Sequence, residues 1–93
     1  MLKLIVLTKA ESDLDGIFIY HNFYSFNSVK NISNKFKLSF NNLKQYLKFG
    51  KICFENNNFR ELICGRYIIY YKIKSEYIVI HRIIDSKMDF NIK

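Results

Sequence analysis

The sequence of 93 residues has no proline and no tryptophan, and it contains only three glycines and two cysteines. The glycines stand far apart, which excludes a glycine-rich phosphate loop. Cys53 and Cys64 lack the paired spacing of a zinc motif, even with His21 and His81 as further ligands, so we expect two reduced, buried thiols. The sequence therefore predicts neither a metal site nor a cofactor.

Acidic residues are scarce as well, with 8 Asp and Glu against 15 Lys and Arg and a formal net charge of +7. Such a charge favours a nucleic acid, an anionic membrane surface or an acidic protein as partner. No apolar stretch approaches the roughly 20 residues that a membrane-spanning helix needs, and the apolar run at residues 1–7 is too short for a signal peptide. We therefore expect a cytoplasmic protein with no membrane partner.

Large apolar side chains are abundant: 49% of the residues are hydrophobic and 17% are aromatic. This composition excludes a disordered chain, and the length predicts a single domain that spans residues 1–93. A domain of this size buries a smaller fraction of its surface than a larger one. We therefore expect some aromatic side chains to stay exposed until a partner covers them.

The first half of the chain has the period of helices. After a short alternating strand at residues 2–6, Thr8 and Glu11 form a capping-box pattern that predicts a helix from about residue 9. A polar break at residues 25–28 separates it from a second amphipathic stretch, which we expect to end at Gly50. Two such helices with a short connection predict an antiparallel hairpin.

The second half has the period of strands. Residues 59–64, 66–73 and 77–84 are rich in Ile, Tyr and Val, and their short connections allow only antiparallel neighbours. Residues 51–54 can add a fourth strand. The fold class is therefore α+β: an N-terminal strand, a two-helix hairpin, and a three- or four-stranded antiparallel sheet with the helices on one face.

The strand at residues 66–73 is apolar on both faces. Tyr67 and Tyr71 lie on one face, whereas Tyr70 and Lys72 lie on the other. Helices can cover only one face, so the second is either an aromatic and basic surface for a partner or is covered by the C-terminal tail.

Arginine occurs only at Arg60, Arg66 and Arg82, all on or beside the predicted sheet. A guanidinium suits either an anionic ligand or an ion pair, and the acids considered as partners are Glu61, Asp85 and Asp89. The ion pair is the favoured interpretation. His21 and His81 have no nucleophile or carboxylate at a telling spacing, so we interpret both as structural.

Two sequence runs resemble the ParE/RelE toxin superfamily. Residues 60–73 (RELICGRYIIYYKI) match its pattern R-x-L-x-x-G-x-Y-x-I-x-Y-x-I, and residues 78–83 (IVIHRI) match I-x-I-x-R-I. Residues 7–17 (LTKAESDLDGI) are similar to the family's opening, with its A-x-x-D-L core. The resemblance implies the toxin of a bacterial type II toxin-antitoxin pair, neutralised by a cognate antitoxin protein.

The superfamily splits by target, and the resemblance favours its ParE-like branch, whose members bind and inhibit DNA gyrase. RelE-like members instead cut mRNA on the ribosome with arginines at two positions that Ile68 and Met88 occupy here. Loss of such cations removes stabilisation of the transition state. The chain also departs from many ParE-like sequences at residues 84–89, which keep the Asp of that pattern but lack its His and its Arg.

The leading hypothesis is therefore a gyrase inhibitor to which no catalytic residues are assigned. The alternatives are a RelE-like endoribonuclease that acts on ribosome-bound mRNA, and an inactive relative that only binds an antitoxin. The candidate residues for contact with the target or the antitoxin are cationic or aromatic and lie in the second half of the chain: Arg60, Arg66, Tyr70, Lys72, Arg82 and Lys87.

Overall fold

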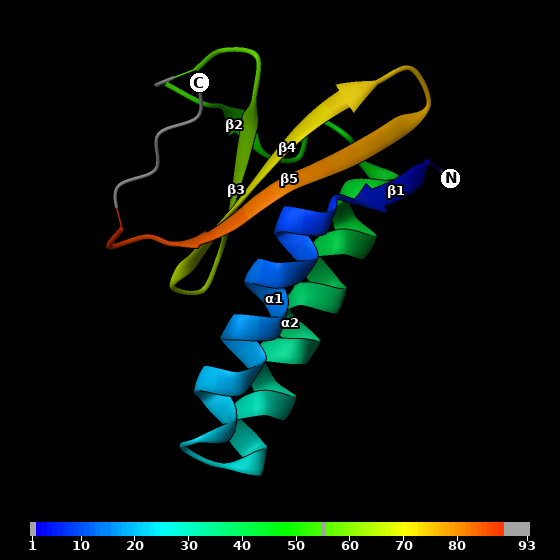
Figure 1. Cartoon of the computed structure of the whole chain (residues 1–93). Coiled ribbons are helices and arrows are strands. Elements are labelled where there is room, and N and C mark those ends of the chain that lie inside the picture. The colour runs from blue at the N-terminus through cyan, green and yellow to red at the C-terminus, as the bar shows by residue number, and fades with distance from the viewer. Residues whose placement is uncertain (1, 55, 89–93) are drawn as a thin grey trace.

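The computed structural model describes residues 2–54 and 56–88 and has one mixed sheet beside a helical hairpin (Figure 1). In chain order the elements are β1 (Lys3–Val6), α1 (Thr8–Asn22), α2 (Phe26–Gln45), β2 (Lys51–Ile52), β3 (Arg60–Cys64), β4 (Tyr67–Lys74) and β5 (Tyr77–Asp85). The five strands lie in the order β1-β5-β4-β3-β2. The predicted α+β class is confirmed.

The sheet is larger than expected because the N-terminal strand joins it. β1 pairs parallel with β5, Leu4 beside Ile78 and Val6 beside Ile80, whereas all other neighbours are antiparallel. A parallel pair needs a long crossover, and the whole helical hairpin provides it. The prediction of a purely antiparallel sheet with three or four strands missed this connection.

The start of α1 differs from the predicted capping box. Thr8 is already helical and the N-cap is Leu7, whose side chain makes no capping hydrogen bond. The backbone N–H of Leu7 donates to the carbonyl of Ile80 at 3.0 Å, which extends the contact with β5 to the first turn of the helix. The prediction of Thr8 as the cap is wrong because this sheet contact fixes where the helix begins.

The start of α2 is determined by a local contact and its end by a distant one. Ser25 caps α2 as the polar break predicts, with its side chain accepting from the N–H of Ser28 at 3.0 Å. α2 ends at Gln45 rather than at Gly50. The buried hydroxyl of Tyr71 donates to the carbonyl of Leu47 and accepts from the N–H of Gly50, at 3.0 and 2.9 Å, and so holds residues 46–50 in a loop.

Two apolar clusters cover the two faces of the sheet. The larger lies between the helices and the sheet and includes Phe36, Leu43, Tyr71 and Ile80. The smaller, on the opposite face, contains Tyr70 together with Cys53 and Phe59, with Ile68 and Ile84 packed against it. Cys53 and Cys64 are both buried thiols, as expected.

Of the two alternatives for the second face of the sheet, an exposed aromatic surface that includes Tyr70 is wrong. Only 6% of Tyr70 is exposed, because Cys53 and Phe59 cover its ring. Cys53 and Phe59, which lie between β2 and β3, therefore cover this face of the sheet, for which the sequence predicted a partner or the C-terminal tail. Part of that tail, residues 89–93, lies outside the described residues.

A β-bulge interrupts the pairing of β4 with β5. Tyr70 pairs with Arg82 and Tyr71 with Ile80, so His81 is the extra residue of β5. The bulge shifts the alternation of β5, and as a result Ile83 rather than Ile84 belongs to the larger cluster. It also explains why His81 and Arg82 have different surroundings.

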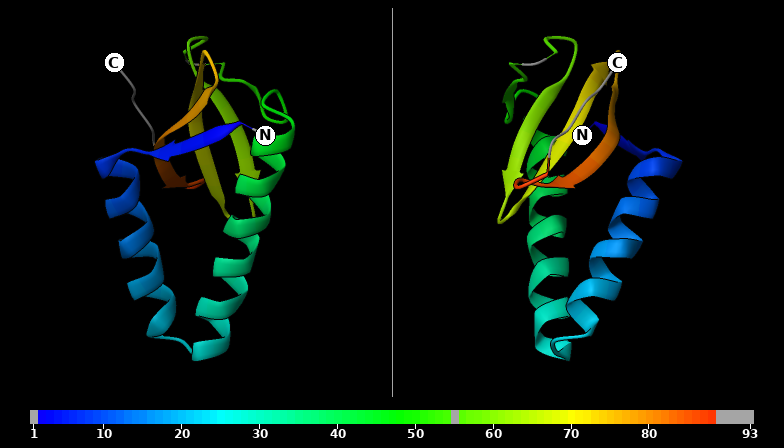
Figure 2. Two further views of the ribbon diagram at one scale, coloured as in Figure 1. Left: turned by 90° about the vertical axis from the view of Figure 1, so that its right-hand side faces the viewer. Right: turned by 60° about the vertical axis from the view of Figure 1, so that its left-hand side comes forward.

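The helical hairpin projects well beyond the sheet (Figures 1 and 2). Exposed aromatic residues lie at its tip, with exposed fractions of 83% for Phe23, 69% for Tyr24 and 77% for Phe26. The expectation that some aromatic side chains stay exposed is confirmed.

Gly50 should tolerate no side chain. A Cβ at this position would lie 2.6 Å from the carbonyl oxygen of Glu61 and 2.7 Å from the hydroxyl of Tyr71. Gly50→Ala should therefore lower the free energy of unfolding by about 1–3 kcal/mol. Chemical denaturation monitored by circular dichroism measures the change.

Gly16→Ala is the matched control, because a Cβ at this exposed position of α1 would meet nothing within 4 Å. Alanine replaces glycine inside a helix, so this variant should gain up to about 1 kcal/mol. Equal effects of the two substitutions would contradict the role assigned to the close packing at Gly50.

Candidate functional site

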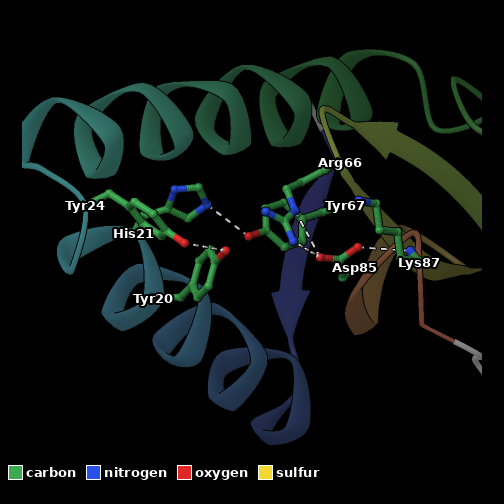
Figure 3. A network of polar contacts seen from close by, with 7 residues as sticks. All are labelled: Tyr20, His21, Tyr24, Arg66, Tyr67, Asp85 and Lys87. Carbon is green, nitrogen blue, oxygen red and sulfur yellow. Dashed lines mark hydrogen bonds and ion pairs between the residues drawn. The ribbon is translucent and has the colours of Figure 1, made fainter.

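A polar network joins α1 to the start of β4 and the end of β5 (Figure 3). Arg66, in the turn between β3 and β4, forms an ion pair with Asp85. The same carboxylate accepts from the backbone N–H of Lys87 at 2.9 Å. On the helix side, the hydroxyls of Tyr20 and Tyr24 share a hydrogen bond of 3.1 Å, and the Arg66 guanidinium lies 5.4 Å from the centre of the Tyr20 ring.

His21 connects both helices to the sheet. Its Nδ1 lies 2.7 Å from the hydroxyl of Ser28 at the start of α2, and its Nε2 lies 2.9 Å from the hydroxyl of Tyr67 on β4. Both ring nitrogens therefore have partners, which confirms the interpretation of His21 as a structural residue. Burial, with a contribution from Arg66, lowers the pKa of His21 and favours its neutral form.

A second ion pair joins α1 to β5. The Nε and Nη2 of Arg82 donate to the two carboxylate oxygens of Asp13 at 2.8 and 3.0 Å. Asp13 also accepts from the backbone N–H of Ile83 at 3.0 Å. The pKa of Arg82 is raised, chiefly by the hydrogen bond to Asp13. This bidentate geometry makes the contact stronger than an ordinary ion pair at the surface.

A cavity of about 360 Å³ lies between these two ion pairs. Arg66, Arg82 and Asp85 contribute polar walls, whereas Ile17 and Met88 contribute apolar ones. The pKa of Asp85 is lowered, first by the N–H of Lys87 and then by Arg66, so its carboxylate stays ionised. The pKa of Tyr20 is lowered by the hydrogen bond to Tyr24 and by Arg66.

The six residues that the sequence nominated lie in three places. Arg66, Arg82 and Lys87 are close to the cavity, and the ion pair of Arg66 with Asp85 is among those expected. Arg82 binds Asp13, an acid that was not among the expected partners. Asp89, the third candidate acid, lies outside the described residues.

The remaining three are separate from this cavity. Arg60 donates from Nη1 to the carbonyl of Gly50 at 2.9 Å and so helps to hold the loop before β2. Lys72 lies over the Phe59 ring, 4.4 Å from its centre, on the face where Tyr70 is buried. The structure does not bring the six residues into one site.

The sequence reasoning missed Tyr20 and Tyr24, which lie one helical turn apart and supply the helix side of the network. Their spacing of four residues was the available signal. In the sequence, Asp13 is marked only as the Asp of the A-x-x-D-L core. Its contact with β5 spans 69 residues of sequence, which no local pattern reveals.

His81 lies at the bulge with the edge of its ring against Phe59, 5.0 Å between ring centres. Its Nε2 is buried and has no hydrogen-bond partner among the described residues. Burial lowers the pKa of His81, and the nearby charges of Lys72 and Lys74 lower it further. A proton on this ring is therefore unfavourable in the folded protein.

Residues 2–54 and 56–88 contain no group of three or more His, Cys, Asp or Glu side chains that could hold a metal ion. In the same part of the chain, no helix has the length and apolar character to span a membrane.

A solved structure shares this fold. A structure described as the chromosomal ParDE TA system from P. aeruginosa superposes with a TM-score of 0.78 over 91% of this chain and 96% of the other, with 21% sequence identity. No curated protein sequence matches significantly. The model of the family described as "ParE toxin of type II toxin-antitoxin system, parDE" matches residues 4–90. The chain belongs to this family of ParE toxins.

Removing the carboxylate of Asp13 should release α1 from β5. Asp13→Ala leaves Arg82 and the N–H of Ile83 without this acceptor, and the loss should be about 2–3 kcal/mol in the free energy of unfolding. Urea denaturation measures it. Asp15→Ala, an exposed site on the same helix, is the control and should change stability by less than about 0.5 kcal/mol. Similar losses in both variants would contradict the proposed anchor.

The stability of the protein should fall as the pH drops below about 6.5, the pKa of an unperturbed histidine. In the folded state the pKa values of His21 and His81 are both lowered, so the unfolded chain takes up protons first and is favoured. Well above pH 6.5 neither state binds a proton at these rings, and the full stability is present.

Urea denaturation at pH 7.5 and pH 5.5 tests this dependence in a window where carboxyl groups barely titrate. His81→Gln removes one of the two titrating rings and should lose less stability between these pH values than the parent protein does. An unchanged pH dependence in His81→Gln would show that the buried ring does not contribute.

Proposed function

We propose that this ParE toxin inhibits DNA gyrase by binding it in the cytoplasm, and that a cognate antitoxin neutralises it by covering exposed apolar surface. The observation that carries the proposal is the match of the ParE family model to residues 4–90. The distribution of exposed apolar and cationic side chains supports it and suggests a separate surface for each partner.

Residues 46–54 are the proposed antitoxin surface. Four large side chains here are strongly exposed: Tyr46 at 64%, Phe49 at 53%, Ile52 at 56% and Phe54 at 96%. They lead into and out of β2, which lies at the edge of the sheet and, among the described residues, pairs with β3 alone. An open edge beside exposed apolar side chains suits an extended peptide that adds a strand. An acidic antitoxin would also be attracted by the charge of +7.

The cavity between α1 and β5 is the proposed gyrase-binding surface. Arg66 lines the cavity, the exposed Lys87 is held beside it by the hydrogen bond from its backbone N–H to Asp85, and Met88, 66% exposed, adds an apolar contact. Arginine is enriched among the residues that contribute most to the affinity of protein interfaces. Arg82 serves this surface indirectly, because its hydrogen bonds to Asp13 hold α1 against β5.

Inhibition by binding is favoured over RNA cleavage. Of the two positions at which RelE-like nucleases have an arginine, Ile68 packs in the smaller apolar cluster and Met88 lines the cavity without a charge. RNA cleavage through the 2′-hydroxyl needs an acid, a base and cations around the phosphate. In the described part of the chain, Arg66 and Arg82, the arginines beside the cavity, are both paired with carboxylates.

Supercoiling of a relaxed plasmid by purified gyrase tests the target. The purified chain should inhibit this reaction, and addition of the antitoxin should restore it. Full supercoiling in the presence of the chain, together with cleavage of mRNA on ribosomes, would replace the proposal by the RelE-like alternative.

The double variant Arg66→Gln with Lys87→Gln tests the proposed gyrase-binding surface. It should raise the concentration needed for half inhibition about tenfold or more, because it removes two cations from this surface. Lys74→Gln, at the opposite end of β4, is the control and should inhibit as the parent does. Binding of the antitoxin should persist in all variants, and an undiminished inhibition by the double variant would exclude this surface.

A further inference from the structure

The outer face of α2 has a continuous stripe of amide and ammonium side chains. Its members recur at steps of three and four residues and alternate in kind: Asn27, Lys30, Asn34, Lys37, Asn41 and Lys44. All are exposed except Lys44, which is half-buried. The side chains that α2 buries, Ile32, Phe36 and Leu43, lie on the opposite side of the helix. We call the six residues the Asn/Lys stripe.

Charge along the sequence is strongly segregated around this stripe. Residues 16–54 contain six lysines and no Asp or Glu, whereas the rest of the chain has nine cations and eight acids. Almost all of the net charge of +7 therefore comes from this one segment. In the described part of the chain, no ion pair involves Lys30, Lys37 or Lys44.

The stripe is not arranged for the stability of the helix. Exposed helix faces are commonly stabilised by oppositely charged pairs four residues apart, and α2 contains none because it has no acid. Asparagine is moreover a poor helix former. A row of like charges with amides between them instead forms an extended set of hydrogen-bond donors for an anion.

We propose that the Asn/Lys stripe binds the phosphate backbone of nucleic acid without sequence preference. Lys and Asn side chains are among the usual donors to phosphate oxygens. From Lys30 to Lys44 the stripe is about 21 Å long by the rise of an α-helix. A DNA duplex has one phosphate per roughly 1.7 Å of its axis, so about a dozen phosphates lie along this length.

Nucleic acid fits the stripe better than an acidic protein does. Protein interfaces are poor in Lys and depend on Trp, Tyr or Arg anchors, and the stripe contains none of these. Phosphate contacts require no apolar anchor, because release of counterions drives them. Most exposed aromatic residues lie beyond the two ends of the stripe, at the hairpin tip, where Phe26 directly precedes Asn27, and along residues 46–54; Tyr20 and Tyr77 lie on α1 and β5.

Fluorescence anisotropy with a labelled duplex of 20 base pairs tests the proposal, and a single-stranded RNA of 20 nucleotides distinguishes DNA from RNA. The full chain should bind at least one of them with a dissociation constant of about 10⁻⁴ to 10⁻⁶ M at physiological salt. Lys30→Gln with Lys37→Gln should weaken binding to DNA about tenfold or more. It should also reduce the slope of log K against log salt by about 2.

Lys9→Gln with Lys74→Gln removes the same number of charges away from the stripe and should retain most of the affinity. Lys30→Arg with Lys37→Arg keeps the charge and should bind as the parent does. Equal losses in the two glutamine variants would overturn the proposal, because net charge alone would then explain binding. Absence of binding to both nucleic acids, or equally strong competition by polyglutamate, would overturn it as well.

Discussion

The buried hydroxyl of Tyr71 determines how the helical hairpin meets the sheet. Tyr71 is completely buried on the central strand β4, and its ring belongs to the larger apolar cluster. A hydroxyl in such a place destabilises the fold unless it is hydrogen-bonded. Leu47 and Gly50 provide these bonds, and the loop they form places Gly50 where Arg60 reaches its carbonyl. The conformation of the loop between α2 and the edge strand β2 therefore depends on the hydroxyl group of Tyr71.

Sequence periodicity predicted the elements, and distant contacts decided their ends. The steps of three and four residues identified both helices, and the alternation of Ile and Tyr identified the three long strands. The errors lie at Thr8, where Leu7 binds Ile80, and at the end of α2, where Tyr71 binds Leu47. In each case the deciding hydrogen bond joins residues more than 20 positions apart, so no local pattern contains the information.

The candidate site was predicted less well than the fold, for a related physical reason. The motif residues that identified the family serve mainly its architecture: Arg60 binds a loop carbonyl, Gly65 adopts a positive φ of 60° in the turn between β3 and β4, and Tyr67 binds His21. A motif of this kind specifies the fold and does not specify the target. The residues that distinguish targets must lie on surfaces that the fold leaves free. No local sequence pattern shows which residues of such a surface lie next to each other.

Those free surfaces differ in chemistry, and this difference explains the composition of the chain. Exposed aromatic side chains at residues 46–54 suit a protein partner, whereas the acid-free outer face of α2 suits a linear polyanion. An excess of 15 cations over 8 acids spread evenly over the chain would attract both kinds of partner to every face. The acids lie outside residues 16–54, and within the described part of the chain they pair with Arg66, Arg82 and Lys51 around the sheet and form no ion pair with the lysines of α2. The same segregation holds the sheet ends together and creates the cationic face of the hairpin.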